Sequence, residues 1–384
     1  MRAGGFKGFI ARYRLSIIYL LTTNGRYLYQ AGSASATAGQ PLHGEIMMDY
    51  GYLGRSALKV SPLCLGAMMF GGETDEATSR RIIDRAFDQG VNFLDTADVY
   101  HAGRSEEIVG RAIAQRRDDW VVATKFGYPA SATARPNEQG QSRKWICQTV
   151  DASLKRLGTD YIDVLYFHRS LNDAPLEEGL RAIGDLIREG KVRYFGLSNF
   201  RAWRVAEVVR LADQLGIDRP VALEPVYNMV DRTAEVELMP AAGHYGIGVV
   251  PYSPLARGVL TGKYALDGAP PADSRAGRGD KRIQQTEWRP ESLAIAQKVA
   301  AHAAERGTTS IAFAIAWVLK NQLVSSAIAG PRTEAHWDSY IDALTLQLGP
   351  DDEKFVDSLV PAGHASTPGY TDPNYPVEGR RVTG

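Results

Sequence analysis

Residues 161–198 read YIDVLYFHRSLNDAPLEEGLRAIGDLIREGKVRYFGLS, and this stretch decides the fold class. It begins with an apolar run at 161–167, continues with an amphipathic segment at 176–189 and ends with a second apolar run at 192–198. This pattern predicts a strand, a helix and a second strand, the unit in which two strands lie parallel. Near-continuous apolar strands are typical of a parallel sheet that is buried on both faces.

The same alternation runs along most of the chain. The expected strands are 61–66, 91–96, 120–125, 161–167, 192–198, 220–225, 247–253 and 324–330. The expected helices are 75–89, one beginning at 105–107, 142–157, 176–189, 201–215, 233–245, 291–306 and 310–320. Eight such units in about 280 residues predict an α/β fold, a closed (β/α)8 TIM barrel. An open doubly wound sheet is the alternative, but the loop after the first strand lacks the glycine spacing of a dinucleotide-binding turn.

Four segments lie outside this alternation. Residues 50–61 predict an N-terminal β-hairpin with its turn at Gly54-Arg55-Ser56, placed to plug the bottom of the barrel. Residues 264–290 form a long loop after the seventh strand, and residues 361–384 form an extended tail rich in Pro and Gly. Loops of this length are functional lids or disordered segments. We therefore expect an extension at 1–47, a barrel at 50–360 and a tail at 361–384.

The N-terminal extension has an unusual composition. Basic residues precede a short apolar run, LSIIYLL, and a stretch of small residues follows, which together resemble a secretory signal. The alternatives are a native disordered extension and a misassigned start, with synthesis beginning at Met47 or Met48. We favour the misassigned start because Gly44-Glu45 can be encoded by a ribosome-binding sequence placed just upstream of these methionines.

Composition excludes several classes of protein. The 44 basic and 44 acidic residues give a formal net charge of zero, so no net field favours nucleic acid or an acidic membrane. The two cysteines, Cys64 and Cys147, cannot build a disulfide framework and indicate a reducing, cytoplasmic environment. We expect a small-molecule partner and no nucleic-acid or membrane partner, and nothing in the sequence indicates an oligomeric state.

Polar or aromatic residues stand at or beside the carboxyl ends of the predicted strands, where a barrel places its chemistry. In chain order they are Asp95, Lys125, His168, Ser198 with Asn199, Glu224, Tyr252 with Ser253, and Gly330 with Arg332. A barrel that was only structural would not need this pattern.

Three of these positions, Asp95, Lys125 and His168, predict a proton donor together with Tyr100. Tyr100 follows Asp95 by five positions, in the loop after the second strand, and Lys125 ends the neighbouring strand. A lysine ammonium near a phenol stabilises the phenolate, and we expect it to lower the tyrosine pKa from its usual value of about 10. Asp95 would orient the lysine, and His168 would hydrogen-bond a substrate oxygen. No metal site is predicted, because His168, His101 and Asp95 lack a recognisable ligand spacing.

The motifs that carry these residues resemble those of the aldo-keto reductase family, from about Tyr52 to about Val360. They are NFLDTADVY (92–100), VVATKFG (121–127), YIDVLYFH (161–168), GKVRYFGLSNF (190–200), PYSPLARGVLTGKY (251–264) and IAGPRT (328–333). The resemblance implies a barrel that binds NADP(H), with Tyr100 as the general acid, Lys125 and Asp95 as its tuning pair and His168 as the group that orients the carbonyl.

The resemblance also implies the cofactor contacts. Ser198 and Asn199 would grip the nicotinamide carboxamide and Tyr252 would stack on the ring. Ser253, Leu255 and Lys263 would lie along the pyrophosphate, with Gly330 nearby, and Arg332 would meet the 2′-phosphate, which favours NADPH over NADH.

The chain departs from the family pattern at three of these contacts. Glu224 replaces the usual Gln that also binds the carboxamide, and we expect its charge to favour the oxidised, cationic nicotinamide. His336 and Tyr340 replace the usual Gln and Asn that address the adenine, so stacking is the alternative way of binding that ring.

The implied activity is reversible reduction of an aldehyde or ketone to an alcohol. A redox-sensing regulatory subunit with slow turnover is the alternative, since some members of the family are associated with channels. Three segments could set the substrate: the polar loop 127–144 with Arg135 and Arg143, an apolar wall of Met68, Met69 and Phe70, and the tail with Tyr370 and Tyr375. For the loop we favour a solvated surface with scattered charges, and the tail is equally consistent with packing on the flank of the barrel.

Overall fold

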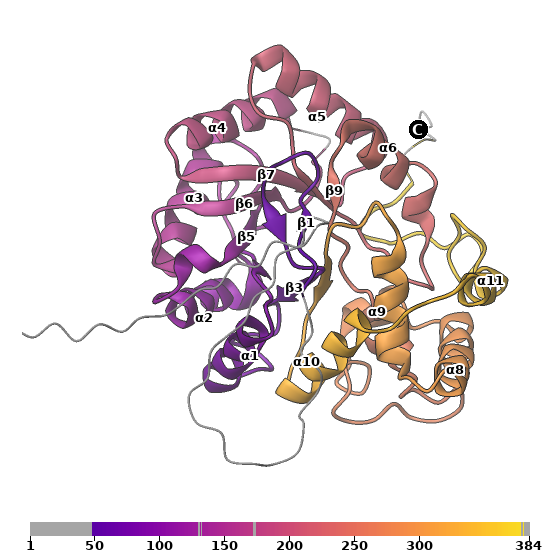
Figure 1. Cartoon of the computed structure of the whole chain (residues 1–384). Coiled ribbons are helices and arrows are strands. Elements are labelled where there is room, and N and C mark those ends of the chain that lie inside the picture. The colour runs from indigo at the N-terminus through magenta and orange to yellow at the C-terminus, as the bar shows by residue number, and fades with distance from the viewer. Residues whose placement is uncertain (1–47, 130, 132, 172–173, 378, 380–384) are drawn as a thin grey trace, which may run out of the picture. The chain divides into compact units, whose positions relative to one another are not determined.

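Eight parallel strands form the centre of the structure, which is a computed structural model that describes residues 48–129, 131, 133–171, 174–377 and 379 (Figure 1). The strands are β3 (Leu63–Gly66), β4 (Phe93–Asp95), β5 (Val121–Phe126), β6 (Ile162–Phe167), β7 (Val192–Ser198), β8 (Ala222–Glu224), β9 (Gly248–Val249) and β10 (Ala327–Ala329). The extension predicted for residues 1–47 lies outside the described residues.

Each strand is paired with its neighbours along the chain, and the sheet order runs β10-β3-β4-β5-β6-β7-β8-β9. The two edges meet through backbone bonds in which Ser325 N donates to Val249 O at 2.8 Å and Ile328 N donates to Pro251 O at 2.9 Å. The sheet therefore closes on itself, and the predicted (β/α)8 barrel is confirmed.

Helices separate the strands and cover the outside of the barrel (Figure 1). They are α1 (Glu76–Asp88), α2 (Arg104–Ile113), α3 (Arg143–Leu157), α4 (Leu176–Arg188), α5 (Ala202–Leu215), α6 (Leu238–Tyr245), α8 (Pro290–Glu305) and α9 (Ser310–Lys320). Side-chain caps begin three of them: Asp75 accepts from Thr78 N, Ser142 from Trp145 N and Thr309 from Ala312 N.

The single helix predicted at 233–245 is wrong. The chain forms a 3-10 turn, η3 (Thr233–Glu235), and then α6, with Glu237 in a non-helical conformation between them. Pro240 accounts for this break, because it lies in the first turn of α6, where its missing N–H costs no hydrogen bond. A continuous helix from residue 233 would place the same proline in its interior.

Three further helices were not predicted. A short helix, α7 (Lys281–Gln285), lies within the long loop 264–290, and α10 (Glu334–Ile341) and α11 (Pro350–Leu359) follow the last strand. None of the helices among the described residues has the length and apolar character needed to cross a bilayer.

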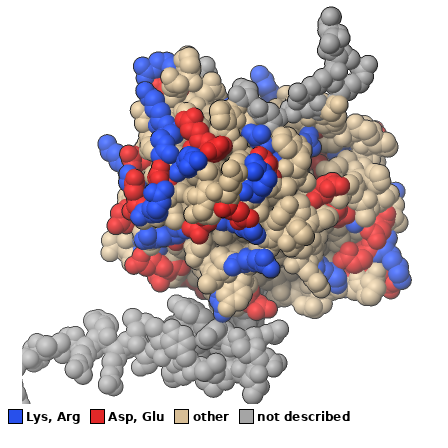
Figure 2. Space-filling view, turned by 90° about the horizontal axis from the view of Figure 1, so that it is seen from above, with Lys and Arg blue, Asp and Glu red and all other residues tan. Residues whose placement is uncertain are grey.

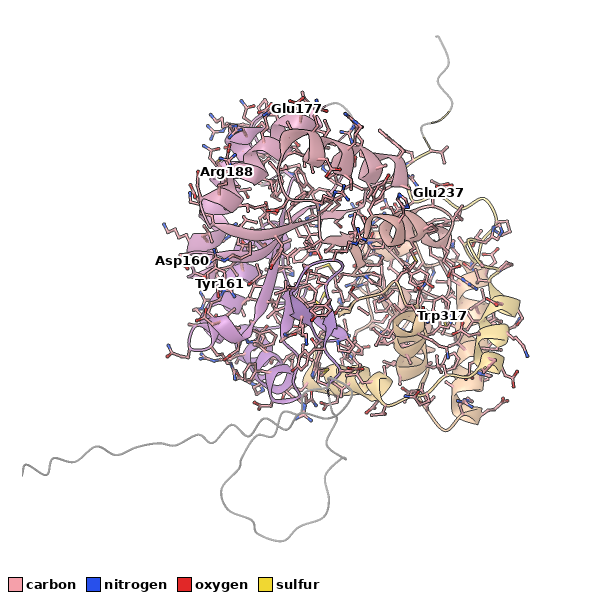
Figure 3. All side chains as sticks on the ribbon, turned by 45° about the horizontal axis from the view of Figure 1, so that its top comes forward. Asp160, Tyr161, Glu177, Arg188, Glu237 and Trp317 are labelled. Atoms are coloured by element: carbon pink, nitrogen blue, oxygen red, sulfur yellow. The ribbon has the colours of Figure 1, made fainter. Side chains whose placement is uncertain are left out.

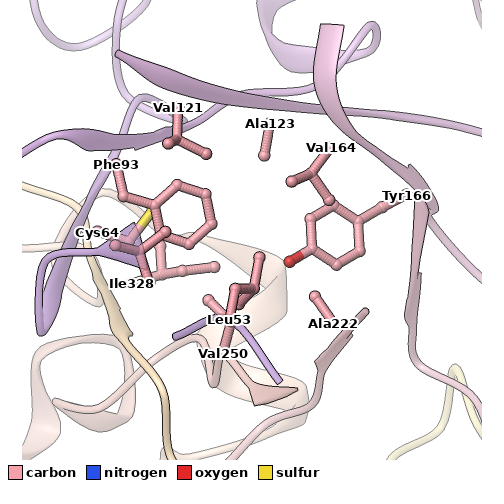
Figure 4. Packing of buried hydrophobic residues seen from close by; sticks show 11 residues of the cluster. Leu53, Cys64, Phe93, Val121, Ala123, Val164, Tyr166, Ala222, Val250 and Ile328 are labelled. Carbon is pink, nitrogen blue, oxygen red and sulfur yellow. The ribbon is translucent and has the colours of Figure 1, made fainter. Parts of the chain in front are cut away.

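The N-terminal hairpin closes the amino end of the barrel, as predicted. Its strands are β1 (Gly51–Tyr52) and β2 (Lys59–Val60), and Arg55 N donates to Gly246 O at 2.8 Å, just before β9. Leu53 from the hairpin is fully buried in a cluster with Cys64, Phe93 and Tyr166, which fills the interior (Figure 4). The hairpin thus leaves only the opposite mouth, at the carboxyl ends of the strands, available for a site.

Basic and acidic side chains are interspersed on the face seen in Figure 2, and none of that face is dominated by one sign of charge.

Candidate active site

One cavity of about 530 Å³ lies at the carboxyl ends of the strands. All predicted site residues except Lys125 line it: Asp95, Tyr100, His168, Ser198, Asn199, Glu224, Tyr252, Ser253, Leu255, Lys263, Gly330, Arg332 and His336. Lys125 is fully buried beneath its floor. The structure thus gathers in one place the residues that the sequence scatters over more than two hundred positions.

The buried lysine organises the floor of the cavity. Lys125 Nζ donates to the carboxylate of Asp95, to Thr96 O at 3.0 Å and to the Tyr100 hydroxyl at 3.3 Å. The register places Asp95 beside Ala123 and brings the ends of β4 and β5 together. The ammonium is therefore held by fixed acceptors, with the phenol as its partner on the cavity side.

The expected lowering of the Tyr100 pKa is not the net result. Burial is the largest influence and raises the pKa of Tyr100 above its usual value, whereas the Lys125 charge acts in the opposite direction. The phenol is consequently protonated at neutral pH, as a proton donor must be. Lys125 itself remains charged: burial disfavours the charge, but the attraction and the hydrogen bond of Asp95 act against burial, and the net pKa of Lys125 is raised.

His168 lies between two aromatic rings at the end of β6. Its ring meets Tyr100 and Tyr128 edge-on, with centroids 5.9 Å and 4.7 Å away. Burial, reinforced by the charges of Lys125 and Arg169, lowers the pKa of His168 well below its usual value. The imidazole is therefore neutral, and its Nδ1 has no partner among the described residues. A neutral ring can accept or donate one hydrogen bond to a substrate oxygen.

Glu224 takes an orientation that the sequence did not indicate. One carboxyl oxygen, Oε1, lies 3.5 Å from Lys125 Nζ, and the other, Oε2, is buried with no partner among the described residues. Burial and the neighbouring Asp95 raise the pKa of Glu224 well above its usual value. The lysine thus has two carboxyl neighbours, one from β4 and one from β8.

A hydrogen-bond network fixes the residues assigned to the carboxamide. Tyr252 OH donates to Asn199 Oδ1 at 2.8 Å, and Asn199 Nδ2 donates to His168 O at 2.9 Å and to Ser198 Oγ at 3.0 Å. Asn199 has a left-handed backbone with φ of 59°. A strained conformation of this kind persists only where surrounding structure holds it, and it often marks a functional position.

The other end of the cavity is basic. Lys263 and Arg332 line it together with Arg257, Arg275, Arg278 and Arg282. Lys263 forms no ion pair among the described residues, and burial with repulsion from Arg332 lowers its pKa. Arg257, Arg275, Arg278 and Arg282 are paired with carboxylates, so within the described part of the chain Lys263 and Arg332 supply the free positive charge at this end. This charge, beside the left-handed residues Ser253, Ala256 and Arg257, fits the phosphates of a dinucleotide. The donor set of this end therefore fits NADP(H).

Sequence reasoning missed several of the residues lining the cavity. Arg275, Arg278 and Arg282 come from the loop 264–290, whose arginine content was the signal that could have identified them. Tyr128 follows β5, and Asn374 belongs to the tail. His336 and Tyr340 both line the basic end, on α10, so the two positions that differ from the family pattern are adjacent there.

The segments expected to set the substrate divide between the cavity and the surface. Met68, Met69 and Tyr375 line the cavity, whereas Phe70 is fully buried outside it. Tyr375 OH lies 2.9 Å from Tyr128 OH, so this part of the tail covers the mouth. Tyr370 packs under Arg289 on the flank.

The polar loop fits the solvated alternative. Arg135 pairs with Glu138 and Arg143 pairs with Asp185, outside the cavity.

Within the described ranges, no three His, Cys, Asp or Glu side chains are grouped in a way that could hold a metal ion.

Comparison with known proteins places the chain in a family. Residues 62–361 match the Aldo/keto reductase family, and the chain belongs to it. A probable voltage-gated potassium channel subunit beta of Arabidopsis thaliana is 42% identical over 78% of this chain and 92% of that protein. An uncharacterized oxidoreductase, YrpG, of Bacillus subtilis is 38% identical over 84% of this chain and 98% of that protein. A versiconal hemiacetal acetate reductase of Aspergillus parasiticus is 33% identical over 81% and 96%, respectively.

Proposed function

We propose that this oxidoreductase uses NADPH to reduce an aldehyde or ketone to an alcohol. The observation that carries the proposal is the 3.3 Å contact between Lys125 Nζ and the Tyr100 hydroxyl at the floor of a cavity whose far end is basic. The named reductase among its relatives supports the reaction class. The free cysteines Cys64 and Cys147 support a cytoplasmic location.

The chain's own residues would supply position and a proton. When bound, the reduced nicotinamide would supply the hydride. Tyr100 would donate its proton to the carbonyl oxygen, with the developing phenolate stabilised by Lys125. Asp95 would hold the lysine in place, and neutral His168 would orient the oxygen through a hydrogen bond.

Preference for NADPH over NADH would come from the basic end. Arg332 lies beside Lys263 at this end and donates a hydrogen bond to the backbone oxygen of Asp273 at 3.0 Å, rather than to a carboxylate. A guanidinium matches the geometry of a phosphate and can bind it in a bidentate manner. The nicotinamide would be held by Ser198, Asn199, Glu224 and Tyr252. The rest of the dinucleotide would be lined by Ser253, Leu255, Gly330 and His336.

The test is Tyr100→Phe. We expect kcat for NADPH oxidation with an activated aldehyde to fall by several orders of magnitude, because phenylalanine has no hydroxyl proton to donate at the position where Lys125 contacts Tyr100. The dissociation constant of NADPH, measured by fluorescence, should change only a few-fold.

Tyr161→Phe is the matched control, because Tyr161 lies on the outside of the barrel with its hydroxyl bonded to Asp118 (Figure 3). Turnover retained in Tyr100→Phe would refute the assigned role of this tyrosine.

A redox-sensing regulatory subunit is the second candidate, favoured by the resemblance to probable channel subunits. The two functions differ in turnover. Sustained oxidation of NADPH over many cycles with an activated aldehyde supports the reductase, whereas one slow turnover per molecule, followed by a stable complex with NADP⁺, supports the sensor.

A further inference from the structure

The pairing of two buried carboxyl groups with one lysine is unexplained by the proposed reduction alone. Asp95 and Glu224 are each 3% exposed, and Lys125 is fully buried between them. Asp95 bonds the ammonium directly, while Glu224 Oε1 lies 3.5 Å from it. One positive charge thus faces two groups that could each be negative.

A buried cluster with a net charge is costly, and a carboxyl group in such a place keeps its proton instead. Asp95 has the shorter contact with the ammonium, so its ionised form is better stabilised. Glu224 has the longer contact and a buried oxygen without a partner among the described residues. The geometry therefore assigns the extra proton to Glu224.

The other groups around Glu224 do not compete for this proton. The ionisable groups that face it from the surrounding elements are Cys64 on β3, Asp95 on β4, Lys125 on β5, Tyr166 on β6, Tyr100 and Tyr252. Burial raises the pKa values of the thiol and of the three phenols, so all four stay protonated. Glu224 is then the member of the cluster whose position fits it to give up a proton.

We propose that Glu224 is a proton-holding residue, neutral while the reduced dinucleotide is bound and ionised once the oxidised dinucleotide has formed. The proposal rests on the proposed reduction. As Tyr100 gives its O–H proton to the substrate oxygen, a proton of Lys125 passes to the phenolate oxygen. The Glu224 carboxylic acid returns a proton to Lys125 Nζ. The net change is one proton lost from Glu224 for each hydride delivered, and Tyr100 and Lys125 are restored.

The location of Glu224 gives the transfer a second consequence. Glu224 lines the cavity next to Ser198, its partner in the register of β7 and β8. A carboxylate formed there attracts the positive charge of an oxidised nicotinamide, whereas a neutral acid does not. Binding of the oxidised form is thus linked to proton release, and binding of the reduced form is not.

The experiment compares the dissociation constants of NADP⁺ and NADPH as a function of pH. Both carry the same 2′-phosphate, so their ratio isolates the nicotinamide. From about pH 6 to about pH 9 we expect the ratio Kd(NADP⁺)/Kd(NADPH) to fall about tenfold in the wild-type protein. In Glu224→Gln the ratio should be independent of pH. Asp98→Asn, which removes another carboxyl group whose side chain accepts from Thr149 Oγ1 and touches Lys125 only through the backbone, should keep the wild-type dependence.

A ratio that is flat in the wild type, or equally steep in Glu224→Gln, would overturn the proposal. If the glutamine variant does not fold, calorimetric titration of the wild type in two buffers of different ionisation enthalpy decides. Proton release with NADP⁺ but not with NADPH supports the proposal, and equal proton counts contradict it. Failure of both dinucleotides to bind would instead remove the proposed function itself.

Discussion

A fully buried lysine is tolerated here because every N–H of its ammonium has an acceptor. Asp95, Thr96 O and the Tyr100 hydroxyl take one each. Removing one member of a buried charged pair leaves the other without compensation, and this is usually more costly than replacing the pair. Lys125 therefore has a structural role as well, and the same contacts that stabilise the floor of the barrel also hold the Tyr100 hydroxyl, the proposed proton donor.

Asp98 allows a prediction about stability and pH. Burial, with repulsion from Glu106, raises the pKa of Asp98 to about 7. Between the unfolded pKa of about 4 and pH 7 the folded state holds a proton that the unfolded state has lost, so stability falls as the pH rises. Asp98→Asn should remove this fall, worth about 1–3 kcal/mol in the free energy of unfolding across that window. Urea unfolding at several pH values measures this free energy. The same dependence on pH in the wild type and in Asp98→Asn would contradict the prediction.

The sequence could predict which residues meet at the candidate active site, but not how each side chain is oriented. Asp95, Lys125 and His168 end neighbouring strands, so their meeting follows from the topology. The orientation of Glu224 toward Lys125 depends on side-chain packing inside the barrel. The net pKa of Tyr100 likewise depends on burial, which the positions of charged residues along a chain do not reveal.

At the scale of elements, the close packing of α2 on α3 depends on one glycine. A β-carbon added at Gly110 would lie 2.3 Å from Leu157 O, a backbone atom that cannot swing away. Gly110→Ala should lower the free energy of unfolding by about 1–3 kcal/mol, even though alanine favours a helix by about 1 kcal/mol. Gly51→Ala, where nothing lies within 4 Å, is the control and should change little. Equal midpoints of urea unfolding for the wild type and Gly110→Ala would show that α2 and α3 can move apart at little cost in free energy.

Helices and strands were predicted most accurately in segments with a single hydrophobic period. The helices at 142–157 and 310–320 were found almost to the residue because Ser142 and Thr309 cap them. α10 and α11 were not predicted, because they follow the last strand and lie beyond the alternation of strands and helices on which the other predictions rest. The strands β8 and β9 are shorter than their apolar runs, and the end of the β9 run lines the cavity through Tyr252 and Ser253.

At the scale of the whole molecule, segments outside the alternation complete the site. The tail bonds to the barrel through Ser366, whose hydroxyl lies 2.8 Å from Ser292 Oγ, and through Arg201, which donates to Tyr375 O at 2.6 Å. The composition of the tail excluded a helix but could not say which surface it covers, because that depends on contacts with residues far away in the sequence.

The last prediction concerns the pair that joins the tail to the long loop. The two terminal nitrogens of Arg282 each donate to one oxygen of the Asp372 carboxylate, and this pair lies beside the cavity with side chains 24% and 19% exposed. Bidentate pairs of this kind are stronger than single contacts, and a partly buried one is screened little by salt. Asp372→Asn would leave the guanidinium without its charge partner and loosen both segments. We expect trypsin to cleave at Arg275 and Arg278 several-fold faster, and NADPH to dissociate several-fold faster in stopped-flow displacement.

Asp351→Asn is the matched control, because its pair with Lys354 is 95% exposed on the aspartate side and lies in α11. An exposed pair contributes little, so this variant should be digested by trypsin at the same rate as the wild type.

Arg282, Asn374 and Tyr375 line the cavity together. Loss of the Arg282–Asp372 pair should therefore raise the dissociation rate of the dinucleotide without moving the groups around Lys125. The kcat of a reaction limited by product release would then rise rather than fall, provided that chemistry stays fast. Unchanged digestion and unchanged dissociation in Asp372→Asn would mean that the backbone and serine contacts alone hold the tail in place.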